Sequence, residues 1–126
     1  MSRIIDIRQL RPGDPVGYGR TYIVGSEPIP VGILPIGYND GLPWSLGNRG
    51  IVVIGGVECP IIGRVSMDSI TVNLQAVLEP TIGMEALIYG QKDGFELRPE
   101  RQAALAGTLP YELLVRLGRR VQRVFI

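Results

Sequence analysis

The chain has 126 residues, enough for one domain with a sizeable buried core. A formal net charge of +1 gives no general attraction to nucleic acid, and no apolar run reaches the ~20 residues that span a membrane. The chain has no histidine and one cysteine, Cys59, which excludes histidine-based triads, histidine-ligated zinc sites and an internal disulfide. We therefore expect no metal, and a reducing, cytoplasmic location in which Cys59 is a buried structural thiol.

The first three quarters of the chain predict short strands separated by turns. The segment RIIDIRQL, residues 3–10, alternates as a strand does, and IVVIGGVECPII, residues 51–62, predicts a hairpin that turns at Gly55-Gly56. SITVNL, residues 69–74, alternates strictly and predicts a half-buried strand. The sequence QKDG places Lys92 in an exposed turn.

The pattern changes to a helical one after Arg98. PERQAALAGTL, residues 99–109, has proline at a first helical position and Gly107 as its stop, and PYELLVRLGRR, residues 110–120, repeats this arrangement. We predict a mainly β domain, a small β-barrel or sandwich of about seven to nine strands, with two short helices near the C-terminus. No linker or repeat divides residues 1–126, which we expect to form a single domain.

Two tyrosines stand among glycines, in VGYGRTY (Tyr18) and in PIGYNDG (Tyr38). The glycines could clear space for a substrate beside the phenol ring, or they could serve only the backbone geometry of this chain. Since Asn39-Asp40-Gly41 is a turn signal, Tyr38 is expected at a strand end.

A polar bend is predicted in GRVSMDSITV, residues 63–72, between two apolar strands. Backbone N–H groups exposed at such a bend can hold a carboxylate, and Arg64 could supply a nearby positive charge. The alternative is a loop in which Asp68 makes a local turn hydrogen bond and Met67 packs in the core. The arginines of RLGRRVQR, residues 116–123, are explained by a helix C-terminus better than by a nucleic-acid surface.

The order of these motifs is more specific than any one of them. VGYGRTY, LPIGYNDGLP, NRG, CPIIGRVSMDSITVNL, TIGMEALIYG and GTLPYELLVRLGRRVQRVF together resemble the C-terminal domain of bacterial alanine racemase, from Arg3 to Ile126. The resemblance implies an isomerase that uses pyridoxal phosphate to interconvert L-alanine and D-alanine for peptidoglycan synthesis. It also implies a head-to-tail homodimer, in which this domain completes the active site on the N-terminal barrel of the partner subunit.

The resemblance assigns roles to particular residues of this chain. It implies that Tyr18 is a catalytic base, that the backbone N–H of Met67 holds the substrate carboxylate, and that Tyr111 contacts the cofactor phosphate. Tyr38, Arg64 and Asp68 match positions at the entrance of the site. Trp44 departs from the pattern, because many members carry a basic residue there.

The cofactor lysine of the family belongs to the N-terminal barrel, and Lys92 is a poor substitute for it. We therefore expect this chain to correspond to the C-terminal domain without the barrel, to be inactive alone, and to self-associate or expose a patch around Tyr18, Tyr38 and Met67. Two alternatives stay open: a racemase domain for serine or for a broad range of amino acids, and a non-catalytic β-barrel binding module.

Overall fold

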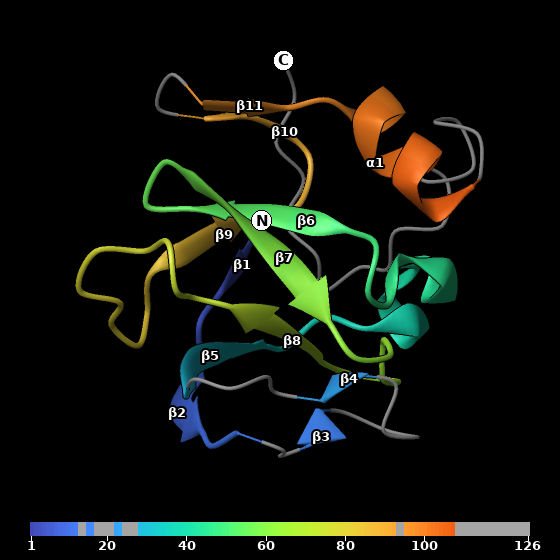
Figure 1. Ribbon diagram of the computed structural model, residues 1–126. Helices are drawn as coiled ribbons and strands as arrows, with labels where there is room; N and C mark the ends of the chain where they lie inside the picture. The colour runs from blue at the N-terminus through green and yellow to red at the C-terminus, as the bar shows by residue number, and fades with distance from the viewer. Residues whose placement is uncertain (13–14, 17–21, 24–27, 93–94, 108–126) are drawn as a thin grey trace.

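The computed structural model describes residues 1–12, 15–16, 22–23, 28–92 and 95–107 (Figure 1). Their regular secondary structure is mainly strand, as the sequence predicts. Seven of the strands make one sheet: β1 (Ser2–Arg3), β2 (Asp6–Leu10), β5 (Ile29–Leu34), β6 (Ile51–Ile54), β7 (Val57–Ile62), β8 (Ile70–Asn73) and β9 (Glu85–Leu87). Two small two-stranded sheets pair β3 (Pro15–Val16) with β4 (Tyr22–Ile23) and β10 (Gly90–Lys92) with β11 (Phe95–Leu97).

The large sheet is antiparallel and curls into a half-barrel (Figure 1). Its strand order is β1-β9-β6-β7-β8-β5-β2, so that β1 and β2 lie at opposite edges although only Ile4 and Ile5 separate them in the chain. Two extended residues span only about 7 Å, so the sheet must curl to bring its edges together. Backbone hydrogen bonds complete this closure, from Gly83 N–H to Ile4 O and from Ile5 N–H to Ile33 O, at 2.8 and 2.9 Å.

The curl corrects the expectation of one continuous strand over residues 3–10. The chain passes from one sheet edge to the other at Ile4-Ile5, which separates β1 from β2. Ile4 is buried in the core, whereas Ile5 is 54% exposed.

Two other local predictions are confirmed. Gly55 and Gly56 form the turn between β6 and β7 with φ of 60° and 80°, a left-handed conformation that glycine adopts without steric cost. In β8, Ile70 and Val72 are buried while Thr71 and Asn73 are half-buried, as the alternating sequence predicts. The buried side chains of the large sheet form the main core together with Leu42, Leu46 and Ala103.

The first predicted helix is present as α1 (Pro99–Ala106), which begins with a proline and ends at Gly107. Its only fully buried polar side chain within the described residues is Gln102, whose Nε2 donates hydrogen bonds to the carbonyls of Ile51 and Ile88 at 2.6 and 2.8 Å. The Gln102 Oε1 accepts from the Ile51 N–H at 3.2 Å, so this amide is fully satisfied and fixes α1 to the sheet. The second predicted helix, residues 110–120, lies outside the described residues, as does the arginine-rich segment 116–123.

Within the described part of the chain, no helix has the length and apolar character needed to cross a membrane. The same residues contain no group of three or more side chains suited to hold a metal ion. Cys59 is fully buried on β7, and burial raises the pKa of its thiol to about 11.

Candidate functional site

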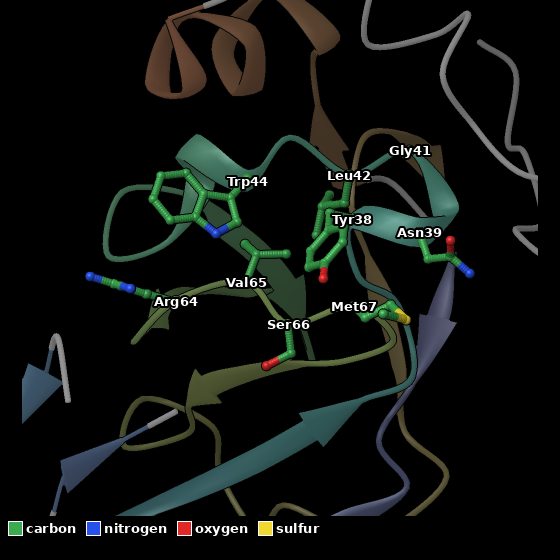
Figure 2. A pocket seen from close by; sticks show the side chains of 9 residues that line it. All are labelled: Tyr38, Asn39, Gly41, Leu42, Trp44, Arg64, Val65, Ser66 and Met67. Carbon is green, nitrogen blue, oxygen red and sulfur yellow. The ribbon is translucent and has the colours of Figure 1, made fainter. Parts of the chain in front are cut away.

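An open pocket of about 930 Å³ lies between two segments that are distant in the sequence (Figure 2). One wall carries Tyr38 and Asn39 on the 3-10 helix η2 (Tyr38–Asp40), followed by Trp44 on the 3-10 helix η3 (Trp44–Leu46). The other wall is the connection from β7 to β8, residues 64–67. Figure 2 shows the Tyr38 hydroxyl directed toward the wall that carries Ser66 and Met67.

The two walls are joined by backbone hydrogen bonds. Tyr38 N–H donates to Ser66 O at 3.0 Å, and Asn39 N–H donates to Met67 O at 2.9 Å. The buried carboxylate of Asp40 accepts a hydrogen bond from Gly37 N–H at 3.0 Å, which holds the turn that presents Tyr38. The predicted strand end at Tyr38 is therefore a 3-10 turn that rests on the second wall.

Gly37 makes this close approach possible. A Cβ atom at position 37 would lie 2.2 Å from Ser66 O and 2.4 Å from Met67 O, far inside van der Waals contact. Of the two interpretations of the glycines beside the tyrosines, the backbone interpretation therefore holds for Gly37. Gly37 makes room for the backbone of this chain and not for a substrate.

The β7–β8 connection is held in a second place by Asn48. The Asn48 Oδ1 accepts from Gly63 N–H at 2.6 Å, and the Asn48 N–H donates to Gly63 O at 3.1 Å. This reciprocal pair fixes the backbone immediately before Arg64 against the residues that follow η3. η3 is also joined to α1, because the hydroxyl of Ser45 in η3 donates to the Ala106 carbonyl at 2.5 Å.

Three of the predicted site residues therefore meet at one pocket: Tyr38, Arg64 and Met67. Tyr38 and Met67 are 46% and 52% exposed, so an exposed patch is present around them. Asp68 is exposed at the bend next to Met67 and is not one of the residues that line the pocket. Tyr18 and Tyr111 lie outside the described residues.

The pocket also contains Trp44 and Ser66, for which the sequence analysis predicted no role. Trp44 is 58% exposed on the wall, and the Arg64 guanidinium carbon lies 5.8 Å from the centre of the indole ring. Ser66 also faces the pocket (Figure 2). The signal for Trp44 was present in the sequence, because a tryptophan between Pro43 and Ser45 in a polar loop is an unusual place for so large an apolar side chain.

Arg64 is the only cation that lines the pocket, and no lysine does. The one lysine of the sequence, Lys92, is the last residue of β10 and is not among the residues that line the pocket.

The half-barrel and its pocket define a β domain that presents an open site on its surface. A family model described as "Alanine racemase, C-terminal domain" matches residues 1–125. The chain belongs to this family.

Relatives and solved structures agree with the family match. The alanine racemase of Brucella ovis is 41% identical over 125 residues, which is 99% of this chain and 31% of the relative, and that of Thermodesulfovibrio yellowstonii is 34% identical and covered to 34%. The structure of alanine racemase from Streptomyces coelicolor matches 98% of this chain with a TM-score of 0.88 and 34% identity, over 32% of that structure. The structure from Bartonella henselae, which has covalently bound pyridoxal phosphate, matches 98% of this chain with a TM-score of 0.84 and 32% identity, over 33% of its length. The chain thus spans about a third of the length of these relatives.

Proposed function

We propose that the chain serves as the C-terminal domain of a pyridoxal phosphate-dependent alanine racemase that interconverts L-alanine and D-alanine. The observation that carries the proposal is the family match over residues 1–125. The pocket supports it, because Tyr38, Arg64 and Met67 come from separate motifs and line one open surface. A non-catalytic binding module would not need the whole ordered series of motifs.

Racemisation requires that a proton leaves one face of the substrate Cα and returns to the opposite face. Two groups on opposite sides can do this, and we propose that Tyr18 of this chain is one and a lysine of the barrel domain of a partner subunit is the other. When bound, pyridoxal phosphate delocalises the charge that develops on Cα. A phenol has an ordinary pKa near ~10, so Tyr18 can accept a proton at neutral pH only where positive charge stabilises its anion.

The β7–β8 bend would hold the substrate carboxylate. Because the peptide unit between Ser66 and Met67 is trans, its N–H points opposite to its carbonyl, and the carbonyl accepts from Tyr38 N–H. The Met67 N–H is thus directed away from η2, and no backbone acceptor for it is found among the described residues. We propose that this N–H binds the carboxylate, that Tyr111 contacts the cofactor phosphate, and that Tyr38, Arg64 and Asp68 form the entrance.

The lysine and most of the cofactor contacts would belong to the barrel domain of a partner subunit in a homodimer. The 126-residue chain on its own should therefore be inactive. Incubation with pyridoxal phosphate and L-alanine should give no D-alanine, and D-alanine formation above a protein-free control would contradict the division of the site between domains. We further propose a cytoplasmic location, with which the reduced, buried Cys59 is compatible.

The catalytic role of Tyr18 is tested with the chain joined to a barrel domain. Tyr18→Phe should reduce racemisation about 10²- to 10⁴-fold, because the phenolic oxygen no longer exchanges a proton. The loss should be selective: exchange of the α-hydrogen with deuterated solvent should persist for the enantiomer served by the lysine. Tyr38→Phe is the matched control and should retain exchange of both enantiomers. Equal loss of exchange for both enantiomers in Tyr18→Phe would contradict the two-base assignment.

The substrate is tested in the same assay. Parallel measurements with alanine and serine compare kcat/KM for the two amino acids. A preference for alanine is expected, and a preference for serine would replace the proposed substrate while leaving the family unchanged.

A further inference from the structure

Trp44 and Arg64 form a pair at the outer part of the pocket, which we call the Trp44–Arg64 rim. The guanidinium carbon of Arg64 lies 5.8 Å from the indole centre, within the distance at which a cation is attracted to the face of an aromatic ring. In Figure 2 the Trp44 and Arg64 side chains, which come from opposite walls, lie at the same end of the pocket, and Tyr38 lies farther along it.

The backbones that carry the two side chains are fixed relative to each other. The reciprocal hydrogen bonds between Asn48 and Gly63 join the segment after Trp44 to the segment before Arg64. Packing is equally close at Gly47, where an added Cβ would lie 3.0 Å from the Arg64 Cα. The main chain therefore holds Trp44 and Arg64 at a fixed separation, which favours the cation–π contact.

The charge of Arg64 is not neutralised by a carboxylate among the described residues, since no described acidic side chain forms a salt bridge with it. Arg64 as a whole residue is partly exposed and lines an open pocket, where its guanidinium donors can meet a small anion. A free arginine side chain would sample many rotamers, and the broad face of the indole limits them without neutralising the charge.

We propose that Trp44 is a positioning residue that holds the Arg64 guanidinium at the mouth of the pocket, where it receives small monocarboxylate anions. The inference rests on the proposed function only for the identity of the natural anion, the carboxylate of the amino-acid substrate. The rim itself is a property of this chain and can be measured without racemase activity.

The first test uses the fact that the chain contains one tryptophan. Quenching of Trp44 fluorescence by iodide is expected to be stronger than quenching by caesium, because a cation beside the ring attracts iodide. Arg64→Gln should remove this preference and leave quenching by neutral acrylamide unchanged, whereas the control Arg8→Gln, on the distant strand β2, should retain it. An unchanged iodide preference in Arg64→Gln would show that the guanidinium is not at the ring and would overturn the proposal.

The second test measures the positioning role with acetate as the probe. The Nε–H resonance of Arg64, followed by NMR, should shift on titration with acetate, and Trp44→Leu should weaken the apparent affinity about two- to five-fold. Trp44→Tyr retains an aromatic face and should restore most of the affinity. Equal acetate affinity in the wild-type and Trp44→Leu chains would refute a positioning role for Trp44.

The third test uses the chain joined to a barrel domain. Trp44→Leu should raise KM for both alanine enantiomers about two- to five-fold with kcat changed less than about two-fold. A fall in kcat with unchanged KM would overturn the assignment to substrate capture. Complete absence of racemase activity in the wild-type protein would instead contradict the proposed function, and the two measurements on the chain alone would still decide whether the rim exists.

Discussion

Replacement of Gly37 by alanine tests how the pocket is built. The backbone at Gly37 is extended, with φ of −147° and ψ of −165°, so alanine meets no conformational penalty there. The new Cβ would, however, lie 2.2 Å from Ser66 O and 2.5 Å from Met67 C. These are backbone atoms that cannot rotate away, so η2 and the β7–β8 connection must separate.

The cost of the Gly37→Ala change follows from what the separation disrupts. Two backbone hydrogen bonds, Tyr38 N–H to Ser66 O and Asn39 N–H to Met67 O, would lengthen or break, at a cost of about 1–3 kcal/mol. Overpacking contributes a further cost of about 1–3 kcal/mol. The alanine variant has a lower conformational entropy in the unfolded state, which offsets about 0.4–1 kcal/mol of this cost. We expect the free energy of unfolding to fall by about 2–4 kcal/mol, a large part of the stability of a small domain.

Urea denaturation followed by circular dichroism measures this change, and Gly32→Ala is the matched control. Gly32 lies in β5, where an added Cβ would come 3.0 Å from the Leu74 Cδ1, the end of a flexible side chain. The control should therefore stay within about 1 kcal/mol of the wild type. If Gly37→Ala were as stable as Gly32→Ala, the contact between the pocket walls would not be as close as described.

Three further predictions concern the anchoring of α1 and the core. Gln102→Leu should lower the free energy of unfolding by about 2–4 kcal/mol, because it leaves backbone groups of Ile51 and Ile88 without partners, whereas Gln9→Leu, at an exposed position of β2, should have a smaller effect in the same urea titration. The hydrogen bonds from Arg101 hold the pKa of Glu58 below its ordinary value of 4.5, so the stabilisation is present above that value and is lost as the pH falls through the folded-state pKa. Glu58→Gln should accordingly lose less stability on acidification than the wild type, by a small amount because the pair is exposed, and an equal loss in both would contradict the linkage. Cys59, buried and with its pKa raised to about 11, should resist an aromatic disulfide reagent at about pH 8 until urea unfolds the chain; rapid labelling of the folded protein would refute its burial.

The candidate site shows where sequence reasoning succeeds and where it stops. The motif order drew attention to Tyr38, Arg64 and Met67, and the structure brings these three to one pocket. The sequence did not reveal that the Arg64 guanidinium lies over the Trp44 ring, because nothing local links two residues on different walls. The proposed roles of Tyr18 and Tyr111 remain predictions, since both lie outside the described residues.

Gln102 is another residue whose role the sequence hides. Its neighbours Arg101 and Ala104 are exposed, and a glutamine beside them is ordinarily a solvent-facing helical residue. Its burial depends on the carbonyls of Ile51 and Ile88, which reach it only after the sheet has formed.

The sequence by itself determined the family, the mainly β character, the Gly55-Gly56 hairpin, the half-buried strand β8 and the bounds of α1. The family rests on the order of the motifs, whereas the other features depend on backbone preferences and on periodicity within a few residues, which neighbouring side chains encode directly. Only the tertiary structure decided that Ile4-Ile5 joins opposite edges of the sheet, that Gly37 serves the packing of two backbone segments, and that Trp44 meets Arg64. The first depends on the curl of the sheet. The other two depend on strand pairing, which sets the residues after β5 beside the connection that leads into β8, and the sequence carries no local signal of such contacts.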